Sequence, residues 1–160
     1  MELIKLNIIG LSYSQFKSGA YALFLEENHG FKKLSIVIGA CEAQAIAIGL
    51  DKNIVSPRPL THDLFLTIAK QANLILDKII IHKLEKGIFF SSIKFINKDS
   101  NKNFIIDART SDAIAIAIRF NAPIYTYKKI LDKANTDFNK EEEVKAEELD
   151  LSSKRKESEK

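Results

Sequence analysis

Three short segments of the chain place polar side chains that could do chemistry directly beside apolar runs. Residues 39–44 contain Glu42, residues 58–63 contain four polar side-chain types, and residues 107–112 contain two carboxylates around an arginine. Such side chains suit phosphate binding, proton transfer or the ligation of a hard metal ion. Each segment also has a purely structural interpretation as the start of a helix.

The segment RPLTHD (58–63) has the highest density of polar types. Arg58 could bind a phosphate through two parallel hydrogen bonds, and Thr61 and the free N–H groups of a helix start could hold the same anion. His62 and Asp63 could supply a general base or a metal ligand. The alternative makes Thr61 the N-cap of a helix with Asp63 in its first turn. These residues alone leave both interpretations open.

The segment DARTSD (107–112) follows an expected strand and opens an expected helix. Asp107 and Asp112 would then lie at one edge of the sheet, where two carboxylates suit Mg²⁺ or Mn²⁺. Arg109 and Ser111 could bind a phosphate between them. The alternative is an Asp–Arg ion pair beside a serine N-cap, which would only stabilise the helix.

Residues 40–50 are expected to form a helix that is apolar on most sides, and Glu42 falls in its first turn. A carboxylate there either points into a cleft or interacts favourably with the helix dipole. We expect Cys41 to be a buried small side chain, because no neighbour in sequence would lower the pKa of its thiol.

Arginine is scarce in this chain, which has 20 lysines and only 4 arginines. An arginine in such a background indicates a place where a rigid bidentate fork is needed. Within residues 1–135 these places are Arg58, Arg109 and Arg119.

Hydrophobic periodicity and turn residues predict an α+β fold with a mixed, mainly antiparallel sheet and three or so helices. Lys86-Gly87 predicts a hairpin turn. The expected strands are 2–13, 19–26, 33–38, 75–84, 88–97, 103–107 and 123–127. The expected helices are 40–50, 62–73 with Thr61 as cap, 111–120 with Ser111 or Thr110 as cap, and a helical turn at 128–134.

Charge and composition divide the chain into a single domain at 1–132 and a charged tail at 133–160. The net charge of +3 combines a body (1–135) of +6 with an end (136–160) of −3. A basic body is compatible with a nucleic-acid partner. The end segment has too few large apolar residues to fold, so we expect it to be disordered or to form a frayed, solvated helix.

Several protein classes are excluded or disfavoured. A single cysteine rules out an internal disulfide framework, and no apolar run is long enough for a membrane span, so we expect a cytoplasmic protein without a membrane partner. Motifs of P-loop, dinucleotide-binding, serine hydrolase and zincin types are missing. The run Ile79-Ile80-Ile81 is more aliphatic than one sheet face needs, which favours a homo-oligomer, most simply a dimer.

Taken together, the segments IVIGACEAQAIAIGL, RPLTHDL and IDARTSDAIAIAIRFNAPIY resemble, in this order and spacing, the bifunctional nuclease domain family of bacteria and plants. The resemblance covers about residues 1–132. It implies a compact α+β domain, often oligomeric, that cleaves DNA and RNA with a divalent cation. The polar motif positions of the family fall on Glu42, Arg58, Thr61, His62, Asp63, Asp107, Arg109, Ser111 and Asp112.

The leading hypothesis is a metal-dependent nuclease of low sequence specificity. Asp107 and Asp112, with Asp63 or Glu42, would hold one or two Mg²⁺ or Mn²⁺ ions. His62 would be a general base or a ligand, and Arg58 and Arg109 would bind the scissile phosphate. The alternative is a non-catalytic oligomeric binding or regulatory module, in which the Asp/Arg/His cluster is structural or binds a ligand.

Overall fold

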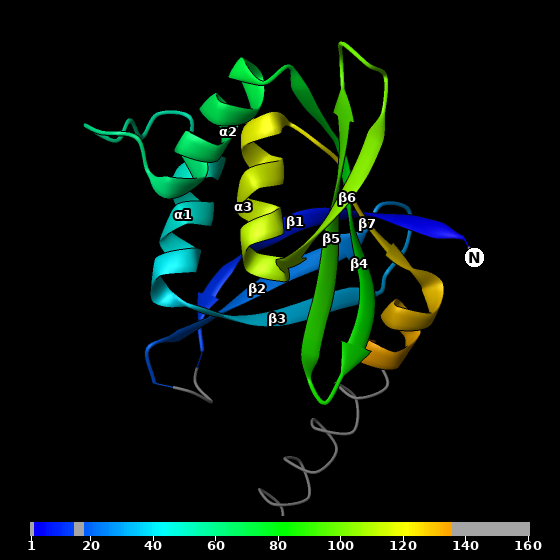
Figure 1. Cartoon of the computed structure of the whole chain (residues 1–160). Coiled ribbons are helices and arrows are strands. Elements are labelled where there is room, and N and C mark those ends of the chain that lie inside the picture. The colour runs from blue at the N-terminus through cyan, green and yellow to red at the C-terminus, as the bar shows by residue number, and fades with distance from the viewer. Residues whose placement is uncertain (1, 15–17, 136–160) are drawn as a thin grey trace, which may run out of the picture.

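The computed structural model describes residues 2–14 and 18–135, and within them the chain forms one seven-stranded sheet with helices packed on it (Figure 1). The strands are β1 (Leu3–Tyr13), β2 (Ala20–Glu27), β3 (Lys33–Gly39), β4 (Leu74–Glu85), β5 (Ile88–Asn97), β6 (Asn103–Arg109) and β7 (Ile124–Tyr127). The helices are α1 (Ala40–Leu50), α2 (Thr61–Gln71) and α3 (Thr110–Phe120), and residues 128–135 are also helical. The expected α+β class is therefore confirmed.

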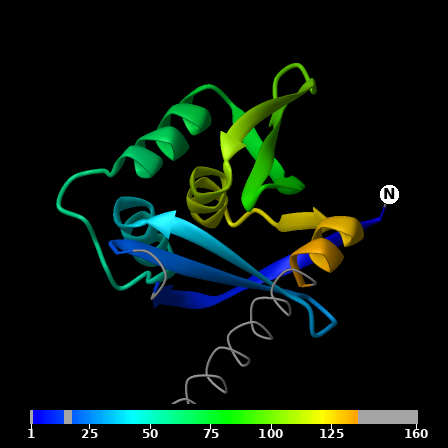
Figure 2. The same ribbon diagram turned by 90° about the horizontal axis from the view of Figure 1, so that it is seen from below.

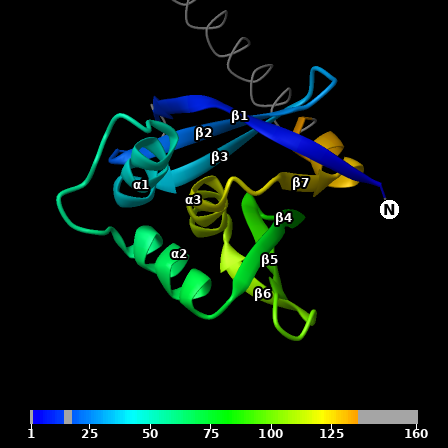
Figure 3. The same ribbon diagram turned by 90° about the horizontal axis from the view of Figure 1, so that it is seen from above.

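The sheet has the strand order β3-β2-β1-β7-β4-β5-β6. All neighbours are antiparallel except β4 and β7, which run parallel. The expected β4–β5 hairpin turns at Lys86 and Gly87, whose φ angles of 50° and 75° match a tight hairpin turn. The strand β7 joins two halves of the sheet, β1–β3 and β4–β6, which cross steeply when the molecule is viewed from above (Figure 3).

Helix α3 lies at the centre of the molecule, between the two halves of the sheet and beside both other helices (Figures 2 and 3). Its Ala/Ile repeat is buried on nearly all sides, with Ala113, Ile114, Ala115 and Ala117 fully enclosed. Small alanines let neighbouring elements approach closely, and the isoleucines fill the space between them. The buried helix predicted from this repeat is confirmed.

The starts of α2 and α3 differ from the expected caps. The N-cap residue is Leu60 in α2 and Arg109 in α3. Thr61, the expected cap of α2, and Thr110, one of the two expected caps of α3, are instead the first residues of their helices. The hydroxyl of Thr110 instead lies 2.6 Å from the hydroxyl of Ser91 and donates to the carbonyl of Phe89. This contact ties the start of α3 to β5, because a buried hydroxyl must find a partner.

The aliphatic run in β4 is explained within one chain. Ile79 and Ile81 are fully buried and Ile80 is half-buried, and β4 is an inner strand of the sheet that packs against α3 and α2. The C-terminal helical segment (128–135) also packs on the hydrophobic core, where its Ile130 and Leu131 are buried. Asn135 hydrogen-bonds to Lys33 at the last described residue, and the rest of the predicted tail lies outside the described residues.

No helix among the described residues is both long and apolar enough to cross a membrane.

Candidate active site

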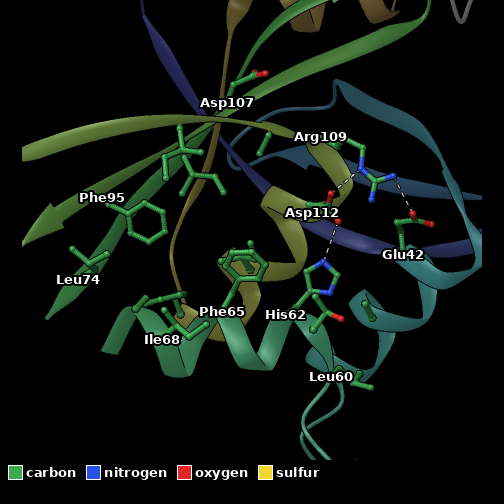
Figure 4. Close-up of a pocket in the computed structure, with 18 of the residues that line it drawn as sticks. Glu42, Leu60, His62, Phe65, Ile68, Leu74, Phe95, Asp107, Arg109 and Asp112 are labelled. Atoms are coloured by element: carbon green, nitrogen blue, oxygen red, sulfur yellow. Dashed lines mark hydrogen bonds and ion pairs between the residues drawn. The ribbon is translucent and has the colours of Figure 1, made fainter. Parts of the chain in front are cut away.

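A groove of about 760 Å³ opens between α2 on one side and β5 and β6 on the other (Figure 4). Helix α3 forms its floor, and the start of α1 closes one end. Most of the wall is apolar, with Phe65, Ile68 and Phe95 projecting into the space. Among the described lining residues, the charged side chains other than Asp107 gather at the end next to α1, so the groove has an apolar body and a polar mouth.

The polar mouth is a chain of four side chains from four different elements (Figure 4). His62, in the first turn of α2, places Nε2 3.1 Å from Oδ1 of Asp112, in the first turn of α3. Arg109, the last residue of β6, donates from Nε to Oδ2 of Asp112 at 2.7 Å. Its Nη1 lies 3.2 Å from Oε1 of Glu42 on α1. We call these four residues the polar cluster.

The contacts within the polar cluster determine which of its atoms carry a hydrogen. Partial burial acts to raise the pKa of Asp112, but hydrogen bonds from Arg109 and His62 outweigh burial and hold that pKa below its ordinary value. A carboxylate only accepts hydrogen bonds, so Nε2 of His62 carries the shared hydrogen. In the neutral ring Nδ1 is then the acceptor nitrogen, which is the form that a general base requires.

Asp63 belongs to a separate, structural network. Its Oδ1 accepts from Nε of Arg119 at 2.6 Å, and its Oδ2 accepts from the backbone N–H of Leu60 at 2.8 Å. Arg119 is only 5 % exposed and also donates to the carbonyls of Ala115 and Ala45. Asp63 therefore fastens the start of α2 to α3, and through Arg119 to α1.

This network lowers the pKa of Asp63. Burial alone would raise it, but the hydrogen bond from Arg119 and the N–H of Leu60 together bring it below the ordinary value. Arg119 was singled out by its type in an arginine-poor chain, yet its role was not predicted, because its partners lie on other elements.

The other predicted site residues lie around the cluster or apart from it. Asp107 lines the edge of the groove, but its carboxylate is directed away from Asp112 and His62 (Figure 4). Thr61 is exposed at the mouth. Arg58 is exposed in the loop before α2, and Ser111 is buried at the start of α3; neither lines the groove.

Cys41 also corrects an expectation. Its side chain was expected to be buried, but it is exposed and lines the mouth of the groove beside Glu42.

A divalent cation does not fit the polar cluster as it stands. No group of three or more His, Cys, Asp or Glu side chains within residues 2–14 and 18–135 is arranged to hold a metal ion. The guanidinium of Arg109 lies between the carboxylates of Glu42 and Asp112, in the position that an ion bridging them would take. An ion could bind both carboxylates only after Arg109 moved.

The aromatic wall of the groove could not be predicted from the sequence, because phenylalanine is most often a core residue. Phe65 is 53 % exposed and Phe104 is 38 % exposed, although both line the groove. Phe104 stacks on Phe95 with ring centroids 5.5 Å apart. The apolar residues of β5 and β6 indicate strands, but not which of their side chains are left uncovered.

The fold and the site together define an α+β domain with an acid–base and guanidinium cluster at the mouth of an open groove. The chain belongs to the bifunctional nuclease domain family, whose model matches residues 23–139. It is also 33 % identical over 130 residues to two uncharacterized proteins of Mycobacterium tuberculosis, MT1877 from strain CDC 1551 / Oshkosh and Rv1829 from strain ATCC 25618 / H37Rv. Each match covers 81 % of this chain and 75 % of the relative.

Proposed function

We propose that this protein hydrolyses phosphodiester bonds in DNA and RNA with low sequence specificity. The family is named for nuclease activity, and the observation that carries the proposal is the hydrogen-bonded series His62–Asp112–Arg109 at the mouth of an open groove. It joins a proton acceptor, an orienting carboxylate and a phosphate-binding group.

Each member of the series has a distinct role in this proposal. Nδ1 of His62 takes a proton from the attacking water, and Asp112 orients the ring and stabilises its positive charge. Arg109, whose side chain is 68 % exposed, binds the scissile phosphate and the charge that develops on it. Glu42 holds the other side of the guanidinium and so sets its direction.

Dependence on Mg²⁺ or Mn²⁺ is implied by the family resemblance and stays a prediction. The charges of the mouth give it an electrostatic reason: two carboxylates (Glu42 and Asp112) flank one guanidinium (Arg109), a formal net charge of −1 with His62 neutral, and Asp107 adds a further carboxylate at the edge of the groove. A cation would offset the repulsion between this charge and a phosphate.

The test is cleavage of labelled single-stranded and duplex DNA and RNA with Mg²⁺, with Mn²⁺ and with EDTA. We expect cleavage that Asp112→Ala reduces at least 100-fold, which is the lower end of what general base catalysis contributes. Asp107→Ala distinguishes a mechanism that uses a bound cation from one in which His62 and Asp112 act as a pair. It should act as strongly as Asp112→Ala if both aspartates hold a cation, and weakly if His62 and Asp112 act as a pair. Cleavage that survives both substitutions unchanged would contradict the proposal.

A non-catalytic binding module is the second candidate, and one observation favours it. All three ionic members of the cluster are already paired with one another, as in a network that stabilises a fold. Full-length protein that binds oligonucleotides without cleaving them under any of the cation conditions would support this candidate.

We also propose that the protein is a homo-oligomer, most simply a dimer, in the cytoplasm. The supporting feature is β6 rather than β4. As an edge strand of the sheet, β6 leaves Phe104, Ile105 and Ile106 38 %, 69 % and 44 % exposed. An exposed apolar edge is a template for pairing with another strand, and a second copy offers the same strand.

A further inference from the structure

The body of the groove has the wrong character for a nucleic-acid backbone. Beyond the polar mouth its walls come from Phe65 and Ile68 on α2 and from Phe95, Phe104 and Ile106 on β5 and β6. A backbone lying along these walls would bring its phosphates against apolar carbon with no described cation beside them, because Arg109 is the one lysine or arginine among the lining residues within 2–14 and 18–135. Desolvating an unpaired charge in this way is costly. Whatever enters the body of the groove is therefore uncharged.

The volume of the groove and its aromatic rings further restrict the kind of group that it can bind. A volume of about 760 Å³ lies in the range of sites that take a cofactor or a small molecule. Phe65 and Phe104 present exposed rings from opposite walls, α2 and β6, and Phe104 is backed by the buried ring of Phe95. Flat aromatic groups gain most from such walls, since aromatic rings favour stacked and edge-to-face contacts.

Polar groups that could meet the edge of a flat heterocycle lie at the rim. Gln44 on α1 and Thr61 on α2 both line the groove near the mouth and are exposed. An amide and a hydroxyl can each donate or accept, so they can pair with different heterocycle edges. The groove is thus suited to a neutral aromatic heterocycle joined to a group that reaches Arg109.

We propose that the groove takes one or more unstacked bases of a single-stranded nucleic acid, with the adjoining phosphate at Arg109. This inference rests on the proposed nuclease function for the phosphate position, but the base contacts are a binding property that stands apart from cleavage. The base stacks against Phe104 and Phe65, and its neutral ring takes the apolar space that phosphates cannot enter. A paired base would first have to leave its duplex, which costs a few kcal/mol. The substrate class is therefore single-stranded DNA and RNA rather than duplex.

The chain has no tryptophan, so a single introduced indole can report on the groove. In Phe104→Trp the new ring lies in the proposed base site, and a stacked base quenches indole fluorescence. Phe31→Trp is the matched control, because Phe31 is 96 % exposed in the turn between β2 and β3 and does not line the groove. The ligand is an oligothymidylate of about 12 nucleotides, within the span of known single-strand grooves, and phosphorothioate linkages keep it intact.

We expect the oligothymidylate to quench Phe104→Trp strongly and Phe31→Trp hardly at all. The same strand annealed to its complement should require at least a tenfold higher concentration. In the natural background, Phe65→Ala and Phe104→Leu should each raise the Kd for the single strand about fivefold or more, as expected for loss of one base–aromatic contact. Phe31→Leu should leave the Kd unchanged, and circular dichroism checks that each variant is folded.

Three outcomes overturn the inference. The first is Phe104→Trp emission that the single strand leaves unchanged, and the second is equal quenching by single strand and duplex. The third is quenching by the single strand that weakens as the protein concentration rises, which would mean that a second copy covers the groove. Quenching without any cleavage by the natural protein would keep the base site and contradict the nuclease function. Cleavage of single strand and duplex at equal rates without quenching would support the nuclease function and contradict the base site.

Discussion

At the scale of single residues, the site depends on how Asp112 is shared. One of its oxygens faces His62 and the other faces Arg109, so a single carboxylate orients both the candidate base and the candidate phosphate ligand. Its lowered pKa keeps it ionised at neutral pH, where it accepts both bonds. Removing its charge should therefore impair two roles together.

We expect Asp112→Asn to lower kcat by about 100-fold or more, because an amide can donate to His62 and so favour the wrong imidazole tautomer. His62→Gln should cause a loss of similar size. The double variant should be little worse than either single variant, since residues that act as a unit are strongly non-additive. Cleavage kinetics with a single-stranded substrate measure this. Simple multiplication of the two losses would indicate that the residues act independently.

Asp63 should contribute to stability only while it is ionised. A carboxyl whose pKa is lower in the folded protein than in the unfolded chain stabilises the fold above its unfolded value of about 3.9. That contribution is lost as the pH falls through the lower folded pKa. We expect the Tm of the natural protein to fall below about pH 4, and the Tm of Asp63→Asn to fall less steeply. Thermal unfolding between pH 2 and 7 tests this, with Asp99→Asn as the exposed control; parallel curves for Asp63→Asn and the natural protein would contradict it.

At the scale of elements, Arg119 joins the three helices that carry the site. Its guanidinium reaches Asp63 on α2 and the carbonyl of Ala45 on α1 from its own position on α3. Gly49 on α1 provides the necessary space, because a Cβ there would lie 2.9 Å from Nη1 of Arg119 and 3.1 Å from Ile118. The junction sets the position of α2, and with it the distance between His62 and Asp112.

We expect Gly49→Ala to destabilise the protein, although alanine is the better helix former by about 1 kcal/mol. The added methyl group meets a guanidinium held by three partners, and overpacking of this kind costs about 1–3 kcal/mol. In an Arg119→Met background the clash with the guanidinium is gone, and Gly49→Ala should become neutral or stabilising. Urea unfolding of the single and double variants measures this coupling. Gly10→Ala, where nothing lies within 4 Å of the new Cβ, is the control.

At the scale of the whole molecule, β3 and β6 are the two edge strands of the sheet that the described residues form. Only β6 exposes three consecutive large apolar side chains, at 104–106. The same strand supplies Arg109 to the polar cluster and Phe104 to the groove. Assembly through β6 would therefore place the sites of two copies near their shared interface.

We expect light scattering at micromolar concentration to give the mass of a dimer. Ile105→Lys should shift the protein towards monomer, because a lysine on an edge strand opposes pairing. Val37→Lys, on the other edge strand and 58 % exposed, should leave the mass unchanged. A monomeric natural protein would remove the oligomer proposal and leave the groove proposal intact.

Local patterns of residues predict most of the elements and the set of polar residues from which the site is made. Alternation in β3, the Lys86-Gly87 turn and the apolar repeat of α3 are local features, and local periodicity is what a sequence displays directly. It could not show which carboxylate serves which partner. Asp63 and Asp112 each open a helix, yet one is bound by an arginine 56 residues away and the other by a histidine 50 residues away.

The packing of the helices on the sheet makes that assignment, and the same packing leaves an aromatic groove open beside the cluster. The reason is geometric. Partners across such separations depend on how α1, α2 and α3 pack, which depends on close contacts such as Gly49 against Arg119. The openness of the groove depends on α2 packing chiefly through Ala69 while Phe65 and Ile68 remain exposed. The apolar side chain of phenylalanine favours burial, but the packing of the elements determines which rings are left uncovered.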